Sequence, residues 1–231
     1  MNDVTVVIIS HDRWDLLKQT IDSFMTYNDY PIENFIIIED SGKIKMKNLI
    51  EFHIKNLPIG LVKHYLLIFN EKNIGLIESI DKAYSYITTP YVFHSEDDYL
   101  YYKSDFIQKS IAVLNINPNI MQVWIRGMDY VTGINIEPEV LKAGDVEYRL
   151  VGSCKDNWWH GFCFQCGLRK MSAYERIKPF TQWSLKDEFI TSRECKIGEA
   201  YHKLGYRAAI LTEGYARHTG YKRSTFGLLN T

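Results

Sequence analysis

Short apolar runs alternate with segments of helical periodicity in the first hundred residues. The runs cover residues 4–10, 35–40, 65–70 and 91–95. Most are almost continuously apolar, as strands of a parallel sheet covered on both faces are. After the first run, Trp14, Leu17, Ile21 and Phe24 recur at helical spacing behind Asp12, which we predict to be the N-cap. The alternation predicts βαβ units, and so an α/β fold with a mainly parallel sheet flanked by helices.

The remaining elements are predicted from weaker patterns. Helices are expected at residues 43–57, 76–87, 104–116 and 186–204, and strands at 121–126, 162–168 and 207–212. The stretch 127–160 reads as loop, and 213–231 as a polar tail. No internal repeat or linker interrupts the chain, which predicts a single domain over residues 1–231.

Composition narrows the class of protein. A chain of 231 residues, 46% hydrophobic and 24% charged, suffices for one α/β core. The net charge of -1, without a basic stripe, argues against a nucleic-acid partner. The first apolar run is too short to span a bilayer. We therefore expect no transmembrane segment and a cytoplasmic protein, with peripheral membrane association left open.

Cysteine spacing gives little support for a metal centre. Cys163 and Cys166 form a CxxC, but no second pair and no histidine pair follows at zinc-site spacing. Without an export signal, disulfides are disfavoured. Ordinary buried thiols are the favoured interpretation.

Acidic and polar side chains follow the predicted strands. Ser10 ends the first run, Asp40 the second, and Glu96-Asp97-Asp98 the fourth. Ligands of open α/β sheets bind beyond the carboxyl ends of the strands. Adjacent carboxylates suit Mg²⁺ or Mn²⁺, which in turn bind substrate phosphates. The alternative is a solvated acidic turn.

The order of these motifs resembles the GT-A glycosyltransferases, particularly the large inverting family 2. The resemblance rests on the first strand and its helix, residues 36–42, the segment Asn70-Glu71-Lys72-Asn73-Ile74-Gly75, and the acidic cluster at the DxD position. It implies a GT-A fold, a nucleotide-sugar donor and a divalent metal. It also implies a nucleotide-sugar-binding half over residues 1–100 and an acceptor-binding, catalytic half over 101–231.

The resemblance assigns donor-side roles by position. Ser10 and Asp40 match nucleoside contacts, and Asn73 and Gly75 match the loop before the donor-side helix. A helix cap for Ser10 and a turn former for Asp40 are the structural alternatives.

The acidic cluster receives roles in the same way. Asp98, the last acid of the motif, is the metal ligand, while Glu96 and Asp97 hold the ribose or a metal-bound water.

An inverting transfer also needs a base that takes the acceptor's proton. If residues 186–204 are helical, Glu194 lies on the apolar stripe of Ile190 and Ile197, where an acid is unusual. In family 2 the base belongs to an acidic pair before a Gly-aromatic-basic turn, which here is Gly205-Tyr206-Arg207. Glu194 stands at the second position of that pair, whereas the first position is Arg193 and departs from the pattern. Alternatives for the base are Asp187, Glu188 and Glu199. The structural alternative pairs Glu194 with Arg193 or Lys196.

Later residues complete the expected site. Several GT-A enzymes use a late histidine as a second metal ligand, and His218 fits that place; a structural or surface histidine is the alternative. Arg217, Lys222 or Arg223 could meet the diphosphate. Trp158 and Trp159 are expected to bind the acceptor, with core packing as the alternative.

The sequence thus predicts metal-dependent transfer of a sugar from a nucleotide donor, UDP-linked, to an acceptor hydroxyl with inversion. Mn²⁺ or Mg²⁺ is the expected cofactor, and the acceptor, whether glycan, lipid-linked or protein, is left open. A sugar-phosphate nucleotidyltransferase is disfavoured because Ser10-His11-Asp12-Arg13 contains no glycine for a phosphate loop. A non-catalytic nucleotide-sugar-binding or zinc-mediated interaction module is the other alternative.

Overall fold

The structure is a computed structural model of the 231-residue chain, and it describes residues 2–57, 60–128, 134–154, 159–183, 189–220 and 223. The strands are β1 (Val4–Ser10), β2 (Ile32–Glu39), β3 (Val62–Phe69), β4 (Tyr91–Glu96), β5 (Tyr99–Tyr101), β6 (Ile120–Trp124), β7 (Leu141–Ala143), β8 (Val146–Val151), β9 (Gly167–Lys170), β10 (Arg207–Leu211) and β11 (Ala216–His218). The helices are α1 (Trp14–Tyr27), α2 (Ile44–Lys55), α3 (Leu76–Tyr84), α4 (Phe106–Ile116), α5 (Met171–Tyr174) and α6 (Ile190–Lys203), with a 3₁₀ helix η2 (Phe180–Trp183).

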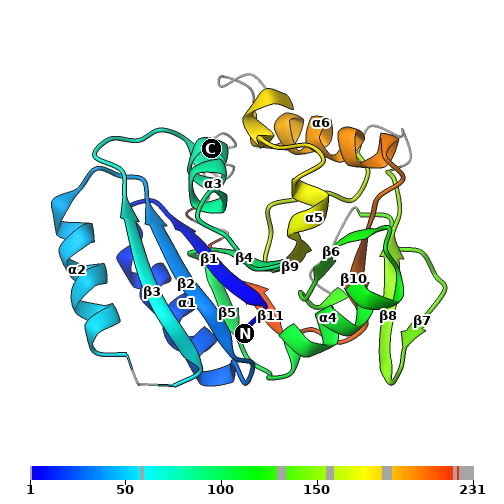
Figure 1. Cartoon of the computed structure of the whole chain (residues 1–231), viewed down its shortest axis with the longest axis horizontal. Coiled ribbons are helices and arrows are strands. Elements are labelled where there is room, and N and C mark those ends of the chain that lie inside the picture. Colours follow the sequence, from blue (N-terminus) through cyan, green and yellow to red (C-terminus); the bar gives the residue numbers. More distant parts are fainter. Residues whose placement is uncertain are drawn as a thin grey trace.

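A nine-stranded mixed sheet with the order β3-β2-β1-β4-β9-β6-β10-β8-β7 runs through the molecule (Figure 1). Strands β3, β2, β1 and β4 are parallel, and β9 runs antiparallel between β4 and β6. From β1 the chain builds outward through β2 and β3 and then returns to place β4 on the other side of β1. The boundary between β1 and β4 is therefore a topological switch point, where α/β sheets bind ligands.

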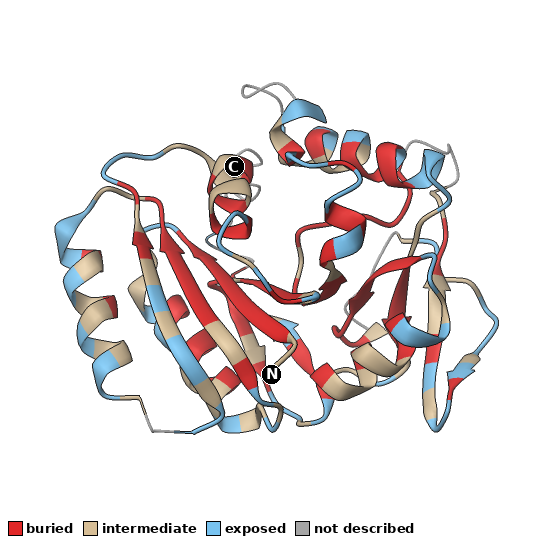
Figure 2. Cartoon of the chain, viewed as in Figure 1, coloured by how far each residue is buried: buried red, intermediate tan, exposed pale blue. Residues whose placement is uncertain are grey.

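Helices cover both faces of this sheet. In β1, Val4, Val6 and Ile8 pack into the core that holds α1, α2 and α4, while Val7 and Ile9 pack into the core that holds α3, α5 and α6. Alternate side chains of a strand point to opposite faces, so two covered faces require a continuous apolar run. Figure 2 shows the central strands buried and the outer face of α2 exposed.

Most predicted elements are confirmed. The first strand is placed at its predicted bounds, and helix α6 occupies the predicted 186–204 segment from residue 190 onward. No helix in the described parts of the chain is long and apolar enough to cross a lipid bilayer.

Several predictions are wrong in informative ways. The N-cap of α1 is Arg13, because Asp12 adopts a left-handed conformation with φ 55° and its carboxylate pairs with Lys43. Helix α6 ends at Lys203, and Leu204, the last residue of the predicted helix 186–204, is its exposed C-cap.

The second half contains more strand than predicted, and one predicted strand is a loop. β7 and β8 form a hairpin within residues 127–160, and β11 lies in the predicted polar tail. The apolar run at 162–168 becomes strand only from Gly167, since Phe162 and Phe164 pack against Phe180 of η2 instead of joining a sheet. Phe162 and Phe164 are buried by tertiary packing. The pattern of apolar residues alone does not distinguish such burial from burial in a strand.

Asp81 of α3 ties the segment around η2 to the core. Its carboxylate accepts hydrogen bonds from Tyr174 Oη at 2.8 Å and from the backbone amides of Phe180 and Thr181 at 2.9 Å each. Removal of the carboxylate would leave three donors without this acceptor.

We therefore expect Asp81→Ala to lower the free energy of unfolding by about 2–4 kcal/mol. Urea titration measures the effect. Lys18→Ala, which removes an exposed ion pair with Asp22, is the control and should change stability by less than about 0.5 kcal/mol. Equal stability of the two variants would show that Asp81 does not anchor this segment.

Candidate active site

One guanidinium organises the acidic cluster at the switch point. Arg13, in the turn after β1, forms an ion pair with the Asp97 carboxylate and another, at 2.8 Å, with Asp98 Oδ2. The backbone amide of His11 also donates to Asp97, at 3.3 Å. The cluster is therefore not a solvated acidic turn: Asp97 and Asp98 are buried and face the turn after β1.

Asp97 is a supporting residue of this cluster. It is fully buried, and burial raises its pKa to about 6 against the lowering effect of Arg13. Both of its oxygens accept hydrogen bonds within the protein, Oδ1 from Arg13 and Oδ2 from Arg13 and His11. These contacts tie the acidic turn after β4 to the turn after β1. The ribose or water contact expected for Asp97 stays a prediction.

Asp98 and His218 come together as the proposed metal ligands would. His218 Nε2 lies 3.2 Å from Asp98 Oδ2, although 120 residues separate them in sequence. Burial acts to raise the pKa of Asp98, but His218 and Arg13 outweigh it and hold the pKa below its usual value. The other oxygen, Oδ1, is buried without a hydrogen-bond partner in the described structure.

This arrangement fits a divalent cation. A buried carboxylate oxygen without a donor is a place for a cation, and carboxylate with imidazole suits Mn²⁺. Across the described ranges no three His, Cys, Asp or Glu side chains form a ready-made metal site. Two protein ligands with a substrate diphosphate completing the shell match the chemistry of such ions.

Gly220 packs against the side chain of Asp98. A Cβ at this position would lie 2.1 Å from Asp98 Oδ2. Thr219, its neighbour, donates from its backbone amide to the Asp98 carbonyl at 2.8 Å. The chain after β11 therefore packs directly on the Asp98 side chain, a contact that no pattern in the sequence indicated.

The charge of Glu194 reaches the acidic cluster. Burial raises the pKa of Glu96 well above its usual value, and the charges of Asp98 and Glu194 raise it further. The Glu194 carboxylate on α6 is therefore close enough to the end of β4 for its charge to act on Glu96.

The environment of Glu194 suits a proton acceptor. The backbone amide of Phe164 donates to its Oε1 at 2.7 Å. Burial raises its pKa to about 7, while that hydrogen bond and the charges of Arg169 and Arg126 act in the opposite direction. A carboxylate with a pKa near the working pH is suited to general base catalysis.

The alternative bases are placed differently. Glu199 is exposed and forms an ion pair with Lys203 at 2.7 Å, so it does not share the position of Glu194. Asp187 and Glu188 lie outside the described residues. Arg193, which could have paired with Glu194, contacts Glu78 of α3 at 3.1 Å.

Asp40 anchors the loop that leads into α3. Its carboxylate accepts from Asn70 Nδ2 at 2.8 Å and from the amides of Ile74 and Gly75 at 2.9 Å each. Gly75 is the N-cap of α3 with φ 111°, a conformation that favours glycine. Asn73 is exposed on this loop. Asp40 therefore shapes the predicted donor loop; direct contact with a base stays a prediction.

Ser10 and Glu39 present unsatisfied polar atoms beside this loop. Both are buried, and neither Ser10 Oγ nor Glu39 Oε2 has a hydrogen-bond partner in the parts of the chain that the structure describes. Glu39 Oε1 accepts from the amides of Asp12 and Ser41 at 3.2 and 3.1 Å. Sequence reasoning passed over Glu39; its place directly beside Asp40 at the end of a buried strand was the available signal.

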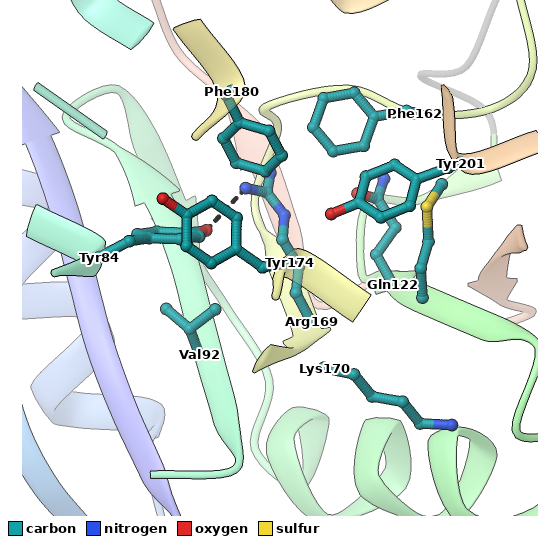
Figure 3. Close-up of a pocket in the computed structure, with 10 residues that line it drawn as sticks. Tyr84, Val92, Gln122, Phe162, Arg169, Lys170, Tyr174, Phe180 and Tyr201 are labelled. Carbon is teal, nitrogen blue, oxygen red and sulfur yellow. Dashed lines mark hydrogen bonds between the residues drawn. The ribbon is translucent and has the colours of Figure 1, made fainter. Parts of the chain in front are cut away.

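A buried polar network centred on Arg169 lies close enough to Glu194 for the charge of Arg169 to act on its pKa. Arg169 of β9 donates to Tyr84 Oη at 2.8 Å and to the Cys163 carbonyl at 2.9 Å, and Tyr84 Oη in turn contacts His94 Nδ1 at 3.1 Å. Figure 3 shows Arg169 and Tyr84 joined beside Phe162, Phe180 and Tyr201. The cavity that they line is only about 10 Å³, too small for a substrate. The network is therefore structural.

Trp159 and the cysteines are packed into the interior. Trp159 is 8% exposed, and its indole Nε1 donates to the Phe162 carbonyl at 2.9 Å. This placement favours the core-packing alternative over an acceptor platform, and Trp158 lies outside the described residues. Cys163 and Cys166 are free and buried, and burial raises the pKa of Cys163 to about 12.

Solved structures share this fold. The mannosyltransferase PcManGT from Pyrobaculum calidifontis, in complex with GDP-Man and Mn²⁺, matches with a TM-score of 0.63 and 15% identity over 89% of this chain and 53% of that chain. GalNAc-T7 with UDP, GalNAc and Mn²⁺ matches with a TM-score of 0.69 and 15% identity over 94% of this chain and 44% of that chain. TarS residues 1–349 from S. aureus match with a TM-score of 0.62 and 11% identity over 96% of this chain and 61% of that chain.

These likenesses confirm the predicted GT-A fold, and the chain spans less than two thirds of the length of each of these proteins. No sequence among curated proteins matches the chain significantly. The family model described as glycosyl transferase family 2 matches residues 5–178, most of its length, and the chain therefore belongs to glycosyl transferase family 2.

Proposed function

We propose that the protein transfers a sugar from a nucleotide-sugar donor, UDP-linked, to an acceptor hydroxyl with inversion at the anomeric carbon. The observation that carries this proposal is Glu194 itself, a carboxylate of raised pKa that the Phe164 amide holds at 2.7 Å and whose charge acts on Glu96, in the same acidic cluster as the Asp98–His218 pair. Membership of family 2 sets aside the nucleotidyltransferase alternative.

The donor would bind at the carboxyl ends of β1, β2 and β4. Ser10 Oγ and Glu39 Oε2, buried without partners in the described structure, suit the N–H and O–H groups of a nucleoside. The loop at Asn73 and Gly75, held by Asp40, would close over the same side. The relatives with bound GDP-Man and UDP support a nucleotide sugar as donor.

Asp98 and His218 would hold Mn²⁺ or Mg²⁺. The bound cation would supply positive charge to the departing diphosphate. Arg13 orients Asp98 for this role by holding Oδ2 and leaving Oδ1 unpaired.

Glu194 would take the proton of the acceptor hydroxyl as its oxygen forms the new bond to the anomeric carbon. The bond between that carbon and the diphosphate oxygen breaks on the opposite face, and the nucleoside diphosphate leaves. The Phe164 amide fixes the carboxylate by its hydrogen bond to Oε1. The other oxygen of Glu194 is thereby left to meet the acceptor.

Removal of the metal ligand tests the donor side. We expect Asp98→Ala to abolish the Mn²⁺-dependent hydrolysis of nucleotide sugars, measured by UDP release across a panel of donors. Proton NMR of the sugar released by the wild type shows whether its anomeric configuration is inverted. Full activity of Asp98→Ala, or of wild type in excess chelator, would reject the metal mechanism.

Gly220 offers a subtler change at the same ligand. Because a Cβ there would meet Asp98 Oδ2 at 2.1 Å, we expect Gly220→Ala to weaken Mn²⁺ affinity by about tenfold, roughly 1.4 kcal/mol. Calorimetry in the presence of UDP measures this. Gly144→Ala, where a Cβ meets nothing within 4 Å, is the control and should bind normally. Equal Mn²⁺ affinity of the two variants would contradict the packing argument.

The pKa of Glu194, about 7, predicts the pH dependence. The base acts when ionised, so kcat/KM should rise with pH up to about 7 and level off above it. Glu194→Gln should still bind UDP with Mn²⁺ but lose about 10²–10⁴-fold in rate. Glu199→Gln, on the exposed side of α6, is the control and should keep the wild-type profile.

The groups that face Glu194 are Arg169 of β9, Arg126 after β6, the Phe164 amide and Glu96 of β4. Since a raised carboxylate pKa makes ionisation unfavourable in the fold, Glu194→Gln should gain stability relative to wild type as pH rises from 4.5 to about 7 and show no further gain above that. A Glu194→Gln variant with unchanged activity would reassign the base.

A further inference from the structure

Arg126 is a buried cation for which the described structure shows no hydrogen-bonding partner. It follows β6 and is 5% exposed, and neither an ion pair nor a side-chain hydrogen bond involves its guanidinium within the described ranges. Its Nε is fully buried and unsatisfied there. Burying a charge without partners is costly, so such a group calls for an explanation, and a bound ligand is one.

Arg169 provides the contrast inside the same fold. It is also 5% exposed, but it donates to Tyr84 Oη and to the carbonyls of Cys163 and Gln165. Among the described residues, Arg169 is thus satisfied, whereas the Arg126 guanidinium contacts the ring of Trp124, 5.9 Å from its guanidinium carbon. Trp124 Nε1 is a second buried donor without a partner in the described structure.

Arg126 is near both the proposed base and the proposed metal ligands. Its backbone forms a bridge with Ala216, two residues before His218. Its charge acts on Glu194 and on Tyr99, whose ring lies 5.4 Å from that of His218.

The two arginines of the site serve different sides. Arg13 is the cation bound to Asp97 and Asp98, next to the place of the donor diphosphate. The charge of Arg126 instead acts on Glu194, the group that would meet the acceptor oxygen. Under the proposed function its guanidinium would therefore serve the sugar and acceptor side of the reaction.

We propose that Arg126 forms a subsite for an anionic group, a carboxylate or a phosphate, carried by the transferred sugar or by the acceptor. The inference rests on the proposed function, because that function defines the donor and acceptor sides. A guanidinium binds both anions through paired N–H donors, and the buried location strengthens those bonds.

The test compares Arg126→Met with wild type by calorimetry in the presence of Mn²⁺. UDP and UDP-glucose report the donor without an anionic sugar, and UDP-glucuronic acid reports a carboxylate on the sugar. Glucuronate and glycerol 3-phosphate, added to protein saturated with UDP, report the acceptor side. Arg126→Lys keeps the positive charge but loses the paired N–H donors of the guanidinium. Its affinity for an anionic probe should therefore lie between those of wild type and Arg126→Met.

We expect Arg126→Met to bind UDP and UDP-glucose within about twofold of wild type and to lose about 10- to 100-fold in affinity for an anionic probe. Loss confined to UDP-glucuronic acid places the anion on the sugar, and loss for glucuronate or glycerol 3-phosphate places it on the acceptor. Unchanged affinity for every probe overturns the proposal, as does a wild type that binds UDP but no anionic probe. Equal loss for UDP itself overturns it too, because Arg126 would then bind the diphosphate. A wild type that does not bind UDP with Mn²⁺ refutes the proposed function instead.

Thermal stability separates a ligand-binding arginine from a structural one. Replacing an unpartnered buried charge with an apolar side chain of similar length should leave the melting temperature unchanged or raise it. Arg169→Met, which leaves Tyr84 and two carbonyls without their donor, should lower it by several degrees. A fall of similar size in Arg126→Met would mean that Arg126 supports the fold, and would overturn the proposal.

Discussion

The neutralisation of adjacent carboxylates by Arg13 is the interaction on which the site depends. Asp97 and Asp98 are buried next to Glu96, and such a group of acids cannot be ionised together without a cation. Arg13 comes from the turn after β1, and the acids from the end of β4, its neighbour in the sheet. The strand order that puts β4 beside β1 therefore also supplies the charge that makes the acidic cluster possible.

The opposite wall of the site depends on a different kind of contact. Helix α6 brings Glu194 over the loop before β9, where the Phe164 amide holds it. Arg169 fixes that loop by binding the carbonyls of Cys163 and Gln165 on either side of Phe164. Arg169 thus holds the loop that carries the Phe164 amide, and that amide holds the Glu194 carboxylate. The position of Glu194 therefore depends on a buried arginine in the core.

The sequence predicted the first half of the fold well because each buried strand there is a continuous apolar run and each helix carries one apolar stripe. It also placed Glu194 on the inner face of α6, since an acid among Ile190 and Ile197 breaks the pattern in a recognisable way. It failed at residues 162–166, where Phe162 and Phe164 are buried by packing outside any strand. The contacts of Arg13 with Asp97 and of Gly220 with Asp98 join residues far apart in sequence, and local periodicity carries no information on such pairs.

Buried polar atoms without partners in the described structure lie on both sides of the site. Beside β1, β2 and β4 they include the acceptors Glu39 Oε2 and Asp98 Oδ1 and the Ser10 hydroxyl, which can donate or accept. At and after β6 they include the donors Trp124 Nε1 and Arg126 Nε and the acceptor Gln122 Oε1. Because buried polar groups are normally satisfied, the carboxylate oxygens suit a ligand that presents N–H and O–H groups or a cation, whereas Arg126 suits one that presents anionic oxygen. Under the proposed function these groups would serve the donor on one side and the acceptor on the other, and Glu194 would act where the two meet.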